Sequence, residues 1–543
     1  MGGKQVNLDA ILFDIGQFGK SQRLTYMMIA LPIMCASMYN MNYNFTARHM
    51  SYRCVVPQCD IENTPLEADW LHYAMPDSED PRRCSRYAPF MNTSLGNSTC
   101  SPEAFDQNTI IGCEDFVFGA GHSIVKELEI QCDGWKRTLV GTIHSVGLLC
   151  ALPLVSVVSD RYGRRLAFVS SAFLAGVFGL ARSFSTSYVM FLIFEFLEPL
   201  FGSGVFSAGF ILGMELVGPK RRVLGSTIIC MFYSSGAMLL GLVAWLIPYW
   251  RDLLRVLYAP SLIFIIYFWL IQESVRWLIS KGQFEKAVEI LKKAAKKNGR
   301  TLSEKSMESL YLNAENEHAH IKAEPEKKQN AFMQCLKSKV IMVRLVTCSF
   351  WWITCTFAYY GLSINAVSLT GNIYLNFVLV SLVELPAYMT GYLVLDRIGR
   401  KSTLCISFIA GGIACIAFPL LPEDVEWLSL VFYLLGKYFI TIAFSALYVY
   451  TSELFPTCLR HSLLGTCSMI GRIGSIVAPQ TPLLAEYVPG LPSYLFGSFA
   501  ILSGLLMLTS PETLNIKLPD TIEEAENIVR KKKSPKKSKT ETP

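Results

Sequence analysis

Residues 160–165 read DRYGRR, and residues 396–401 repeat this stretch as DRIGRK. The first copy follows the second long apolar run of the chain, and the second copy follows the eighth run. The glycine permits a tight turn, while the acid and the arginines can bridge neighbouring helix ends. A second related pair, ELVGPKRR at 215–222 and ELFPTCLR at 453–460, follows the fourth and tenth runs. Both pairs are six runs apart, which indicates an internal duplication of a six-helix unit.

The apolar runs predict the fold class. Of the 543 residues, 52% are hydrophobic and 17% are charged, whereas soluble proteins carry about 25% charged residues. A helix needs about 18–25 apolar residues to cross a hydrocarbon core about 30 Å thick. Twelve runs of this kind lie at 24–44, 138–158, 166–184, 188–212, 223–247, 254–271, 341–361, 373–395, 403–421, 427–450, 463–485 and 492–510. The sequence therefore predicts an all-α membrane protein of twelve transmembrane helices in two pseudo-symmetric six-helix halves.

The distribution of basic residues predicts the orientation. Clusters of Lys and Arg lie near 161–165, 220–222, 276–281, 397–401 and 530–539, all on one side of twelve alternating helices. Positive charge gathers on the cytoplasmic side of membrane proteins, so both termini are predicted to be cytoplasmic. The predicted segments are an N-terminal segment (1–23), a first half (24–271) with an extracellular loop (45–137), a cytoplasmic linker (272–340) containing an amphipathic stretch at 284–297, a second half (341–510) and a basic tail (511–543).

The extracellular loop carries the signs of an oxidising compartment. Six of the sixteen cysteines lie in it, namely Cys54, Cys59, Cys84, Cys100, Cys113 and Cys132. Disulfides persist outside the cell, and the spacing leaves every pairing of the six open. A zinc site is disfavoured because the loop has no CxxC pair. Glycosylation sequons begin at Asn92 and Asn97, and a third begins at Asn44, where the loop starts.

Two charged residues stand inside apolar runs. Arg472 lies within 463–485 and Glu384 within 373–395, and an arginine at mid-membrane costs roughly 2.5–3.5 kcal/mol on the insertion scale. In one interpretation these residues pair with each other, with Lys437 or with Glu195, and hold helices together. In the other, Arg472 faces a cavity and attracts a carboxylate, a sulfate or a similar group of the substrate.

Aromatic residues on the seventh predicted helix are candidates for substrate contact. Trp352 and Tyr359 are seven residues apart and so share a helix face, and Tyr360 follows directly. An aromatic face can bind an organic ion by stacking or by a cation–π contact of about 2 kcal/mol when desolvated. The alternative is that these side chains face lipid or a neighbouring helix.

The sequence disfavours enzymatic and nucleotide-binding functions. The stretch GQFGKS at 16–21 resembles the end of a phosphate loop, but Asp14 stands where its first glycine belongs. The seven histidines form no metal pattern, and the net charge of +6 follows from the membrane topology. We therefore expect no catalysis, no cofactor or bound metal, no ATP and no nucleic acid as partner.

Motifs along nearly the whole chain carry a family resemblance. They are GQFG at 16–19, ESVRWL at 273–278, FAYYGL at 357–362, YLNF at 374–377, ELPA at 384–387, GK at 436–437, YTSELFPT at 450–457, PET at 511–513 and LPDTIEEA at 518–525. With the six-cysteine loop and the paired DRxGR stretches, the chain resembles the major facilitator superfamily and, within it, the organic cation/anion/carnitine transporter family. The sequence departs from the family on the fourth helix, with Glu195 where Arg is usual and Pro199 where Gly is usual.

The resemblance implies a multi-pass plasma-membrane secondary transporter that works by alternating access. Its substrate-binding residues would be Arg472, Glu384, Trp352, Tyr359, Tyr360, Tyr388 and Tyr233. Its cytoplasmic gate would be a charge network of Asp160, Arg161, Arg164, Glu215, Asp396, Arg397, Arg400 and Glu453. Of the substrate-binding residues, Trp352, Tyr359, Tyr360 and Tyr233 match positions that line the family's central cavity.

The resemblance also bears on the cargo. Anion and carnitine carriers of the family have Arg at the position of Arg472, and cation carriers have Asp, whereas Tyr388 stands where anion carriers tend to have Lys. An organic anion or a zwitterion such as a carnitine-like compound is therefore favoured as substrate, with the lipid bilayer and a coupled or exchanged ion as further partners. The alternatives are a cation carrier that uses Glu384, and a transport-inactive receptor or adhesion protein that presents the loop. A receptor has no need of two symmetric gate motifs.

Overall fold

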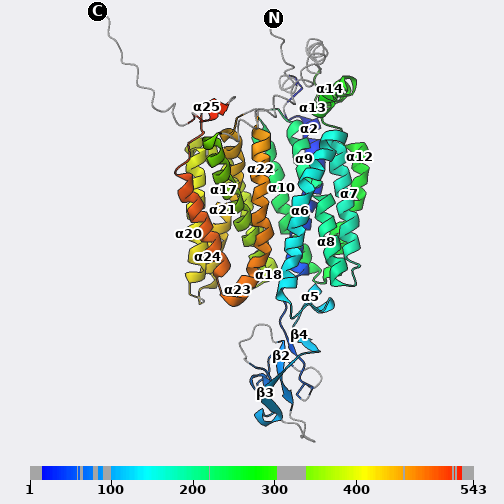
Figure 1. Cartoon of the computed structure of the whole chain (residues 1–543). Coiled ribbons are helices and arrows are strands. Elements are labelled where there is room, and N and C mark those ends of the chain that lie inside the picture. The colour runs from blue at the N-terminus through cyan, green and yellow to red at the C-terminus, as the bar shows by residue number, and fades with distance from the viewer. Residues whose placement is uncertain are drawn as a thin grey trace, which may run out of the picture.

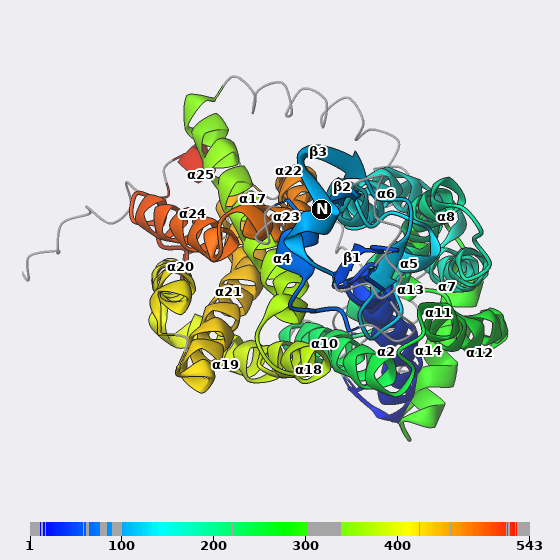
Figure 2. The ribbon, with the colours of Figure 1, turned by 90° about the horizontal axis from the view of Figure 1, so that it is seen from below.

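The computed structural model of the chain consists of two bundles of long helices side by side, with a small domain of short strands beyond one end (Figure 1; Figure 2 shows the bundles from below). We name this end the strand end. The opposite end carries α13 (Val275–Ser280), α14 (Phe284–Lys297) and α25 (Ile522–Glu526), and we name it the linker end. The structure describes residues 11, 15, 16, 18–57, 59, 60, 65–76, 84–89, 100–218, 221–301, 338–422, 424–456, 459–516, 519, 522–526 and 528.

The first bundle holds the six predicted crossings of the first half. The fourth crossing consists of two helices in sequence, and the sixth of two helices with a 3-10 segment between them. The elements are α2 (Lys20–Met41), α6 (Gly134–Tyr162), α7 (Arg164–Arg182), α8 (Tyr188–Gly202) with α9 (Gly204–Glu215), α10 (Arg222–Leu246), and α11 (Trp250–Tyr258) with η3 (Ala259–Ile266) and α12 (Tyr267–Leu270).

The second bundle repeats this arrangement. Its eighth crossing is again interrupted, and its eleventh continues into a 3-10 turn and a short helix at the strand end. The elements are α17 (Lys339–Asn365) with η4 (Ala366–Ser368), α18 (Ile373–Leu382) with α19 (Glu384–Ile398), α20 (Arg400–Ala417) with η5 (Phe418–Leu420), α21 (Glu426–Leu454), α22 (Arg460–Val477) with η6 (Ala478–Gln480) and α23 (Thr481–Tyr487), and α24 (Leu491–Met507).

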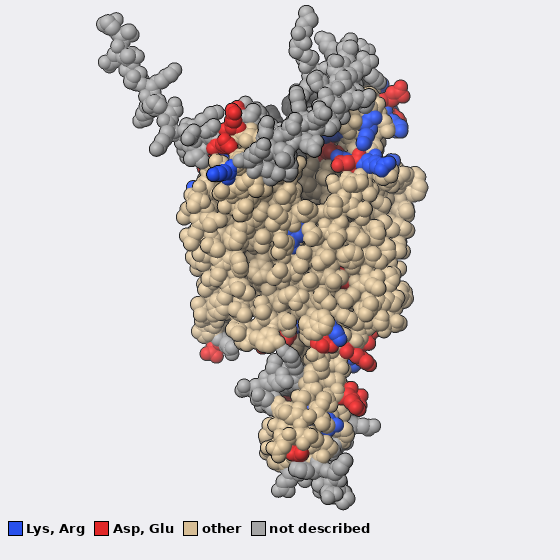
Figure 3. All heavy atoms as spheres, in the orientation of Figure 1, with Lys and Arg blue, Asp and Glu red and all other residues tan. Residues whose placement is uncertain are grey.

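The helices have the dimensions of membrane crossings. Within the part of the chain that the structure describes, ten spans are long and apolar enough to cross a membrane. The shorter helices α22 and α24, of 18 and 17 residues, bring the bundles to the twelve expected crossings. Figure 3 shows an uncharged band around the bundles, with most visible charged side chains above and below it, and a hollow between the bundles near the linker end.

Close packing inside the bundles depends on small residues. Gly412 of α20 lies so near α24 that a Cβ there would come within 2.8 Å of the Gly497 carbonyl oxygen, and a Cβ at Gly497 would come within 2.7 Å of the Gly412 oxygen. Lipid is as apolar as a leucine side chain, so helices in a membrane gain little from burying apolar groups and depend on such close contact.

The strand end carries a small disulfide-bonded domain. It is built from β1 (Tyr52–Cys54) paired with β4 (Phe116–Phe118), and from β2 (Ser85–Pro89) paired with β3 (Phe105–Gly112), both antiparallel. The short helices α3 (Tyr43–Thr46), α4 (Leu71–Ala74), η1 (Pro102–Ala104) and α5 (Ile124–Glu127) complete it. The disulfides are Cys54–Cys113, Cys59–Cys100 and Cys84–Cys132, so the structure resolves the pairing that the spacing left open.

The glycosylation sequons differ in their surroundings. Asn44 is 4% exposed, in α3, and this burial argues against a glycan at that position. Asn92 and Asn97 lie outside the described residues.

The linker helices are fastened to the start of the chain. The amphipathic stretch expected at 284–297 forms α14, whose apolar face buries Val288 and Leu291 in one cluster with Ile11 and Ile15. The Asn298 amide donates to the Ile15 carbonyl at 2.8 Å and to Gln22 at 2.9 Å, and it accepts from the Ser21 amide at 2.9 Å. One side chain after α14 thus binds the chain on both sides of the start of α2.

Candidate functional site

At the linker end, the first DRxGR stretch forms a charge cluster within the first bundle. Arg164 lies 2.8 Å from Asp160 and 3.7 Å from Glu215, the last residue of α9. The backbone amides of Arg164 and Arg165 donate to Glu273 at 3.0 and 3.1 Å. We name Asp160, Arg164, Glu215 and Glu273 the first DRxGR cluster.

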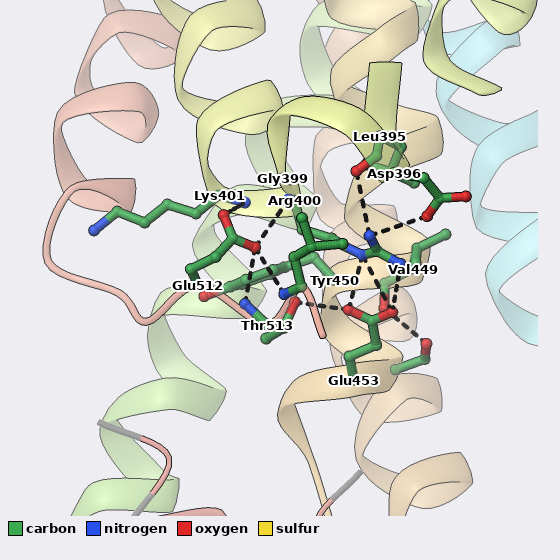
Figure 4. A network of polar contacts seen from close by, with 12 residues as sticks. Leu395, Asp396, Gly399, Arg400, Lys401, Val449, Tyr450, Glu453, Glu512 and Thr513 are labelled. Atoms are coloured by element: carbon green, nitrogen blue, oxygen red, sulfur yellow. Dashed lines mark hydrogen bonds and ion pairs between the residues drawn. The ribbon is translucent and has the colours of Figure 1, made fainter. Parts of the chain in front are cut away.

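The second DRxGR stretch builds the same cluster in the second bundle (Figure 4). Arg400 lies 3.0 Å from Asp396 and 3.1 Å from Glu453 near the end of α21. The backbone amides of Arg400 and Lys401 donate to Glu512 at 2.9 and 3.1 Å. Asp396, Arg400, Glu453 and Glu512 are the second DRxGR cluster.

A glycine makes each cluster possible. Gly163 and Gly399 precede α7 and α20 with φ of 109° and 105°, which an L side chain rarely adopts. A Cβ at Gly163 would come within 2.2 Å of Glu273, and one at Gly399 within 2.6 Å of Glu512. The absent side chain therefore leaves room for a carboxylate at the positive end of a helix.

The structure thus divides the predicted gate network into two. Each cluster lies within one bundle, and Arg161 and Arg397, which are exposed, lie outside both clusters. Glu273 and Glu512 were missed as site residues, although the motifs that contain them, ESVRWL and PET, follow the sixth and twelfth predicted helices and so could have been matched as a pair.

At the strand end, polar contacts join the two bundles. Arg137 of α6 forms an ion pair with Glu486 of α23 at 2.6 Å, and Thr138 donates to Gln480 at 2.8 Å. Closer to mid-bundle, Ser145 donates to the carbonyl of Ser475 at 2.9 Å. These contacts hold α6 against α22 and its extension.

A pocket of about 280 Å³ lies beside the ion pair of Arg137 and Glu486 and includes His49. Burial and the neighbouring Arg137 lower the pKa of His49. Its imidazole is therefore neutral at pH 7 and adds no third charge to the pair.

At mid-bundle in the second half, both carboxylate oxygens of Glu384 have polar partners. Lys437 of α21 forms an ion pair with it at 2.9 Å, and both side chains are buried. The Tyr359 hydroxyl donates to the same carboxylate at 2.8 Å, and Ser234 of α10 in the first bundle also donates to it. Lys437 donates further to Ser363 at 2.7 Å. Of the pairings left open by the sequence, the structure therefore selects Glu384 with Lys437.

Arg472 has different surroundings. It lies on α22 with a partly exposed side chain and interacts with the Tyr360 hydroxyl, with Tyr448 and Tyr233 close by. Among the described residues no carboxylate forms an ion pair with it, so the alternative in which Arg472 pairs with Glu384 is wrong. Glu384 is already held by Lys437.

The predicted aromatic residues lie around this region. Trp352 and Tyr359 both pack against Phe444, at 6.1 and 5.2 Å between ring centroids, as expected for one helix face. Trp352 is 1% exposed and donates to Thr451 at 3.1 Å, while Tyr388 lies beside Glu384. Tyr360 is the more accessible of the two adjacent tyrosines on α17.

The first half has its own buried ions, which the sequence interpretation did not assign. Arg182 at the end of α7 pairs with Glu195 of α8, and His144 of α6 lies 2.9 Å from Glu195 and 3.8 Å from Glu198. Glu195 thus pairs with Arg182 rather than with Arg472. The signal was present, because an ionisable residue inside an apolar run is a functional candidate by default.

Comparisons with known proteins agree with this architecture. A family model described as Major Facilitator Superfamily matches residues 131–479. The organic cation transporter protein of Drosophila melanogaster is 30% identical over 537 residues, which cover 96% of this chain and 95% of that protein. Organic cation/carnitine transporter 2 of Homo sapiens is 32% identical over 531 residues, which cover 95% and 93%.

Among solved structures, the partially occluded inward-open conformation of the xylose transporter XylE from E. coli has a TM-score of 0.60 at 15% sequence identity, and covers 91% of this chain and 99% of that chain. This similarity confirms the fold expected from the paired motifs. The chain therefore belongs to the organic ion transporters of the major facilitator superfamily, multi-pass membrane proteins that are transporters rather than enzymes.

Proposed function

We propose that this transporter moves small organic anions or zwitterions, such as a carnitine-like compound, across the plasma membrane by alternating access. The observation that carries the proposal is the unequal pairing of charges at mid-bundle. Glu384 is neutralised by Lys437, whereas the described neighbours of Arg472 are tyrosines. The net charge available to a substrate there is positive.

A fixed positive charge with no acidic partner attracts an anionic group. Keeping an arginine inside the bilayer is costly, and a carboxylate of the cargo would offset that cost when it binds. Hydrogen bonds to charged groups contribute about 1.5–3 kcal/mol each, and the guanidinium fork can hold a carboxylate through two of them. The hydroxyls of Tyr360 and Tyr448 beside Arg472 add donors to the same site.

A zwitterion would use the aromatic rings as well. A quaternary or primary ammonium is attracted to the face of an aromatic ring, and Tyr360, Tyr448 and Trp352 gather near Arg472. The cation would lie against the rings while the carboxylate binds Arg472.

The arrangement of the halves supports alternating access. Polar contacts join the bundles at the strand end, while each DRxGR cluster is complete within its own bundle. We assign the linker end to the cytoplasm, because the basic clusters at 161–165, 276–281 and 397–401 lie there (Figure 1). The two DRxGR clusters and the exposed Arg161 and Arg397 would then meet across the inner gate when the bundles rock the other way.

One observation favours a second candidate, a cation carrier. Glu384 accepts hydrogen bonds from both bundles, through Tyr359 and Ser234, and several relatives are named organic cation transporters. A cation could bind Glu384 if Lys437 moved away. The receptor or adhesion alternative is set aside, because the matched relatives are transporters over nearly the whole chain.

The test is an uptake screen with labelled benzoate, carnitine and tetraethylammonium in cells that express the chain, at two membrane potentials. In the Arg472→Gln variant, uptake of benzoate or carnitine should fall at least about tenfold, from the loss of one charge-assisted contact. The control Arg255→Gln removes an equal charge from an exposed pair with Asp252 and should leave uptake unchanged. Uptake of tetraethylammonium alone, unaffected by Arg472→Gln, would favour the cation carrier.

A further inference from the structure

We propose, on the basis of the proposed function, that a buried cluster in the first half binds a proton that crosses the membrane together with the anionic cargo. The cluster consists of Arg182, Glu195, Glu198 and His144. It lies within the first bundle, apart from both DRxGR clusters and from the pair of Glu384 and Lys437.

The hydrogen-bond geometry of His144 points to a bound proton. Its Nδ1 lies 2.9 Å from Glu195 Oε1, and its Nε2 lies 3.1 Å from Asn40 Oδ1. Both neighbouring atoms are oxygen acceptors, while a neutral imidazole offers one N–H donor. One additional proton, on the ring or on a neighbouring carboxyl group, lets both contacts form.

Charge balance in the cluster also calls for one additional proton. Arg182 contributes one positive charge, and Glu195 and Glu198 contribute two negative charges when ionised. All four side chains are at most 3% exposed, and Glu198 Oε2 is a buried atom with no hydrogen-bond partner among the described residues. An uncompensated buried charge is costly, and one bound proton brings the cluster to zero net charge.

Among the described residues, the other neighbours of the cluster supply no further charge. From α2, α3 and α11 the cluster is faced by Asn42, Tyr43 and Tyr258, which are neutral at pH 7. Arg137 lies about 10 Å from His144, two turns along α6 toward the strand end, and is itself paired with Glu486 from α23.

A short hydrogen-bonded path joins this cluster to the proposed cargo site. The Asn40 amide, which meets His144 through its oxygen, donates through its nitrogen to the Tyr233 hydroxyl at 3.1 Å. Tyr233 lies close to Arg472 and Tyr360. Two charged groups on the cargo side lie near Tyr233, namely Glu384, which is paired with Lys437, and Arg472. The path places one amide and one hydroxyl between the histidine and this site.

The path also sets the direction of coupling. A carboxylate bound at Arg472 removes the effect of that positive charge and adds negative charge near the cluster, so that the protonated state of the cluster is favoured. By reciprocity, a bound proton raises the affinity for the anion by the same factor. Cargo and proton therefore bind together and are released together, which is symport.

The proton-coupling test uses the full chain in proteoliposomes with three probes: carnitine, tetraethylammonium and, in place of benzoate, benzenesulfonate, which stays ionised and so does not cross the bilayer as a neutral acid. With acid outside, wild-type vesicles should accumulate the monoanionic probe about tenfold for each unit of pH difference, if one proton moves with each cargo molecule. His144→Gln and Glu198→Gln should lose this accumulation, while exchange of labelled for unlabelled probe, which needs no net proton movement, should survive at a reduced rate.

The controls are His122→Gln and Glu289→Gln, the same substitutions at exposed positions, and both should accumulate probe as the wild type does. If wild-type vesicles exchange the probe but gain nothing from the pH difference, the inference is overturned and the proposed function stands. If they exchange none of the three probes, the proposed function fails instead.

A measurement without cargo then decides the proton site. Infrared difference spectra of the purified protein between about pH 6 and about pH 8 report buried carboxyl groups that titrate near neutral pH. A carboxyl band that Glu198→Gln or His144→Gln removes supports the site. A wild-type spectrum with neither such a carboxyl band nor an imidazole band that His144→Gln removes overturns it.

Discussion

The buried ions of the two halves differ, although the halves repeat the same fold. In the second half, one acid and one base, Glu384 and Lys437, form a closed pair. In the first half, Arg182 faces two acids and a histidine. One pair is balanced and the other cluster is not, so under our proposal the balanced pair would hold the structure and the unbalanced cluster would bind the proton.

The DRxGR clusters show the opposite behaviour. The first and second clusters match residue for residue, down to the positive φ of Gly163 and Gly399 and the carboxylate that each glycine admits. Duplication has therefore been kept in the two DRxGR clusters at the linker end and lost among the buried ions at mid-bundle.

The largest expected effect comes from breaking the balanced pair. Lys437→Met leaves Glu384 buried without its base, and an ion pair broken on one side costs about 3–5 kcal/mol. We expect a large drop in the melting temperature of the purified protein in detergent, measured by intrinsic fluorescence. Glu384→Gln, which leaves Lys437 unpaired, should have a similar effect.

The double variant Lys437→Met with Glu384→Gln sharpens this comparison. Because neither charge remains, it should recover most of the lost stability. If the double variant is as unstable as the sum of the single variants, the two residues do not act as one pair.

A smaller effect on stability is expected at the two DRxGR clusters, which match between the halves. Glu273→Gln and Glu512→Gln each weaken the carboxylate that caps a helix, for which about 0.5–2 kcal/mol is typical. Both variants should speed hydrogen exchange more at the starts of α7 and α20 than at the bundle core, and both should lower the maximal uptake rate. Peptide-resolved hydrogen exchange and initial-rate uptake measure the two effects.

The matched control for these caps is Glu289→Gln on the exposed face of α14. It should change neither measurement. If only one of Glu273→Gln and Glu512→Gln changed hydrogen exchange and uptake, the two DRxGR clusters would not be equivalent.

The smallest effect is expected at the contact between the halves. Arg137→Gln removes a partly exposed ion pair with Glu486, worth about 1 kcal/mol or less. The strand end should then open more often, by about fivefold at most. A cysteine placed at Thr142 and labelled with a membrane-impermeant thiol reagent reports this opening from the strand side.

Glu486→Gln should give the same acceleration, and combining it with Arg137→Gln should add nothing further. Unchanged labelling in both single variants would mean that the pair does not hold this end closed.

Much of the fold could be predicted because it follows from local signals. Run length determines where a helix can cross a bilayer, so the twelve expected crossings correspond to the observed helices. The repeated stretches at 160–165 and 396–401 predicted the division into halves. The breaks at Ser203 and Val383, which divide the fourth and eighth crossings, were not predicted, although Pro199 with Gly202 and Gly204, and Pro386, stand beside them.

The pairing of charges could not be predicted, because it depends on which helix faces stack together. Lys437 was one of several possible partners of Glu384, and the choice required the packing of α21 against α19. Arg182 at the end of one crossing pairs with Glu195 in the middle of the next. Helical periodicity predicts neighbours within one helix and therefore could not predict this pair. The disulfide pairing was likewise a matter of folded geometry, which spacing alone does not determine.

The contacts of Asn298 have a practical consequence for dissecting the transporter. Because this amide binds Ile15, Ser21 and Gln22, the linker helices α13 and α14 are part of the first half rather than a hinge between the two. A transporter expressed as two separate fragments should therefore be divided after residue 301. A division before α13 would remove from the first fragment the contacts of Asn298 that stabilise the start of α2.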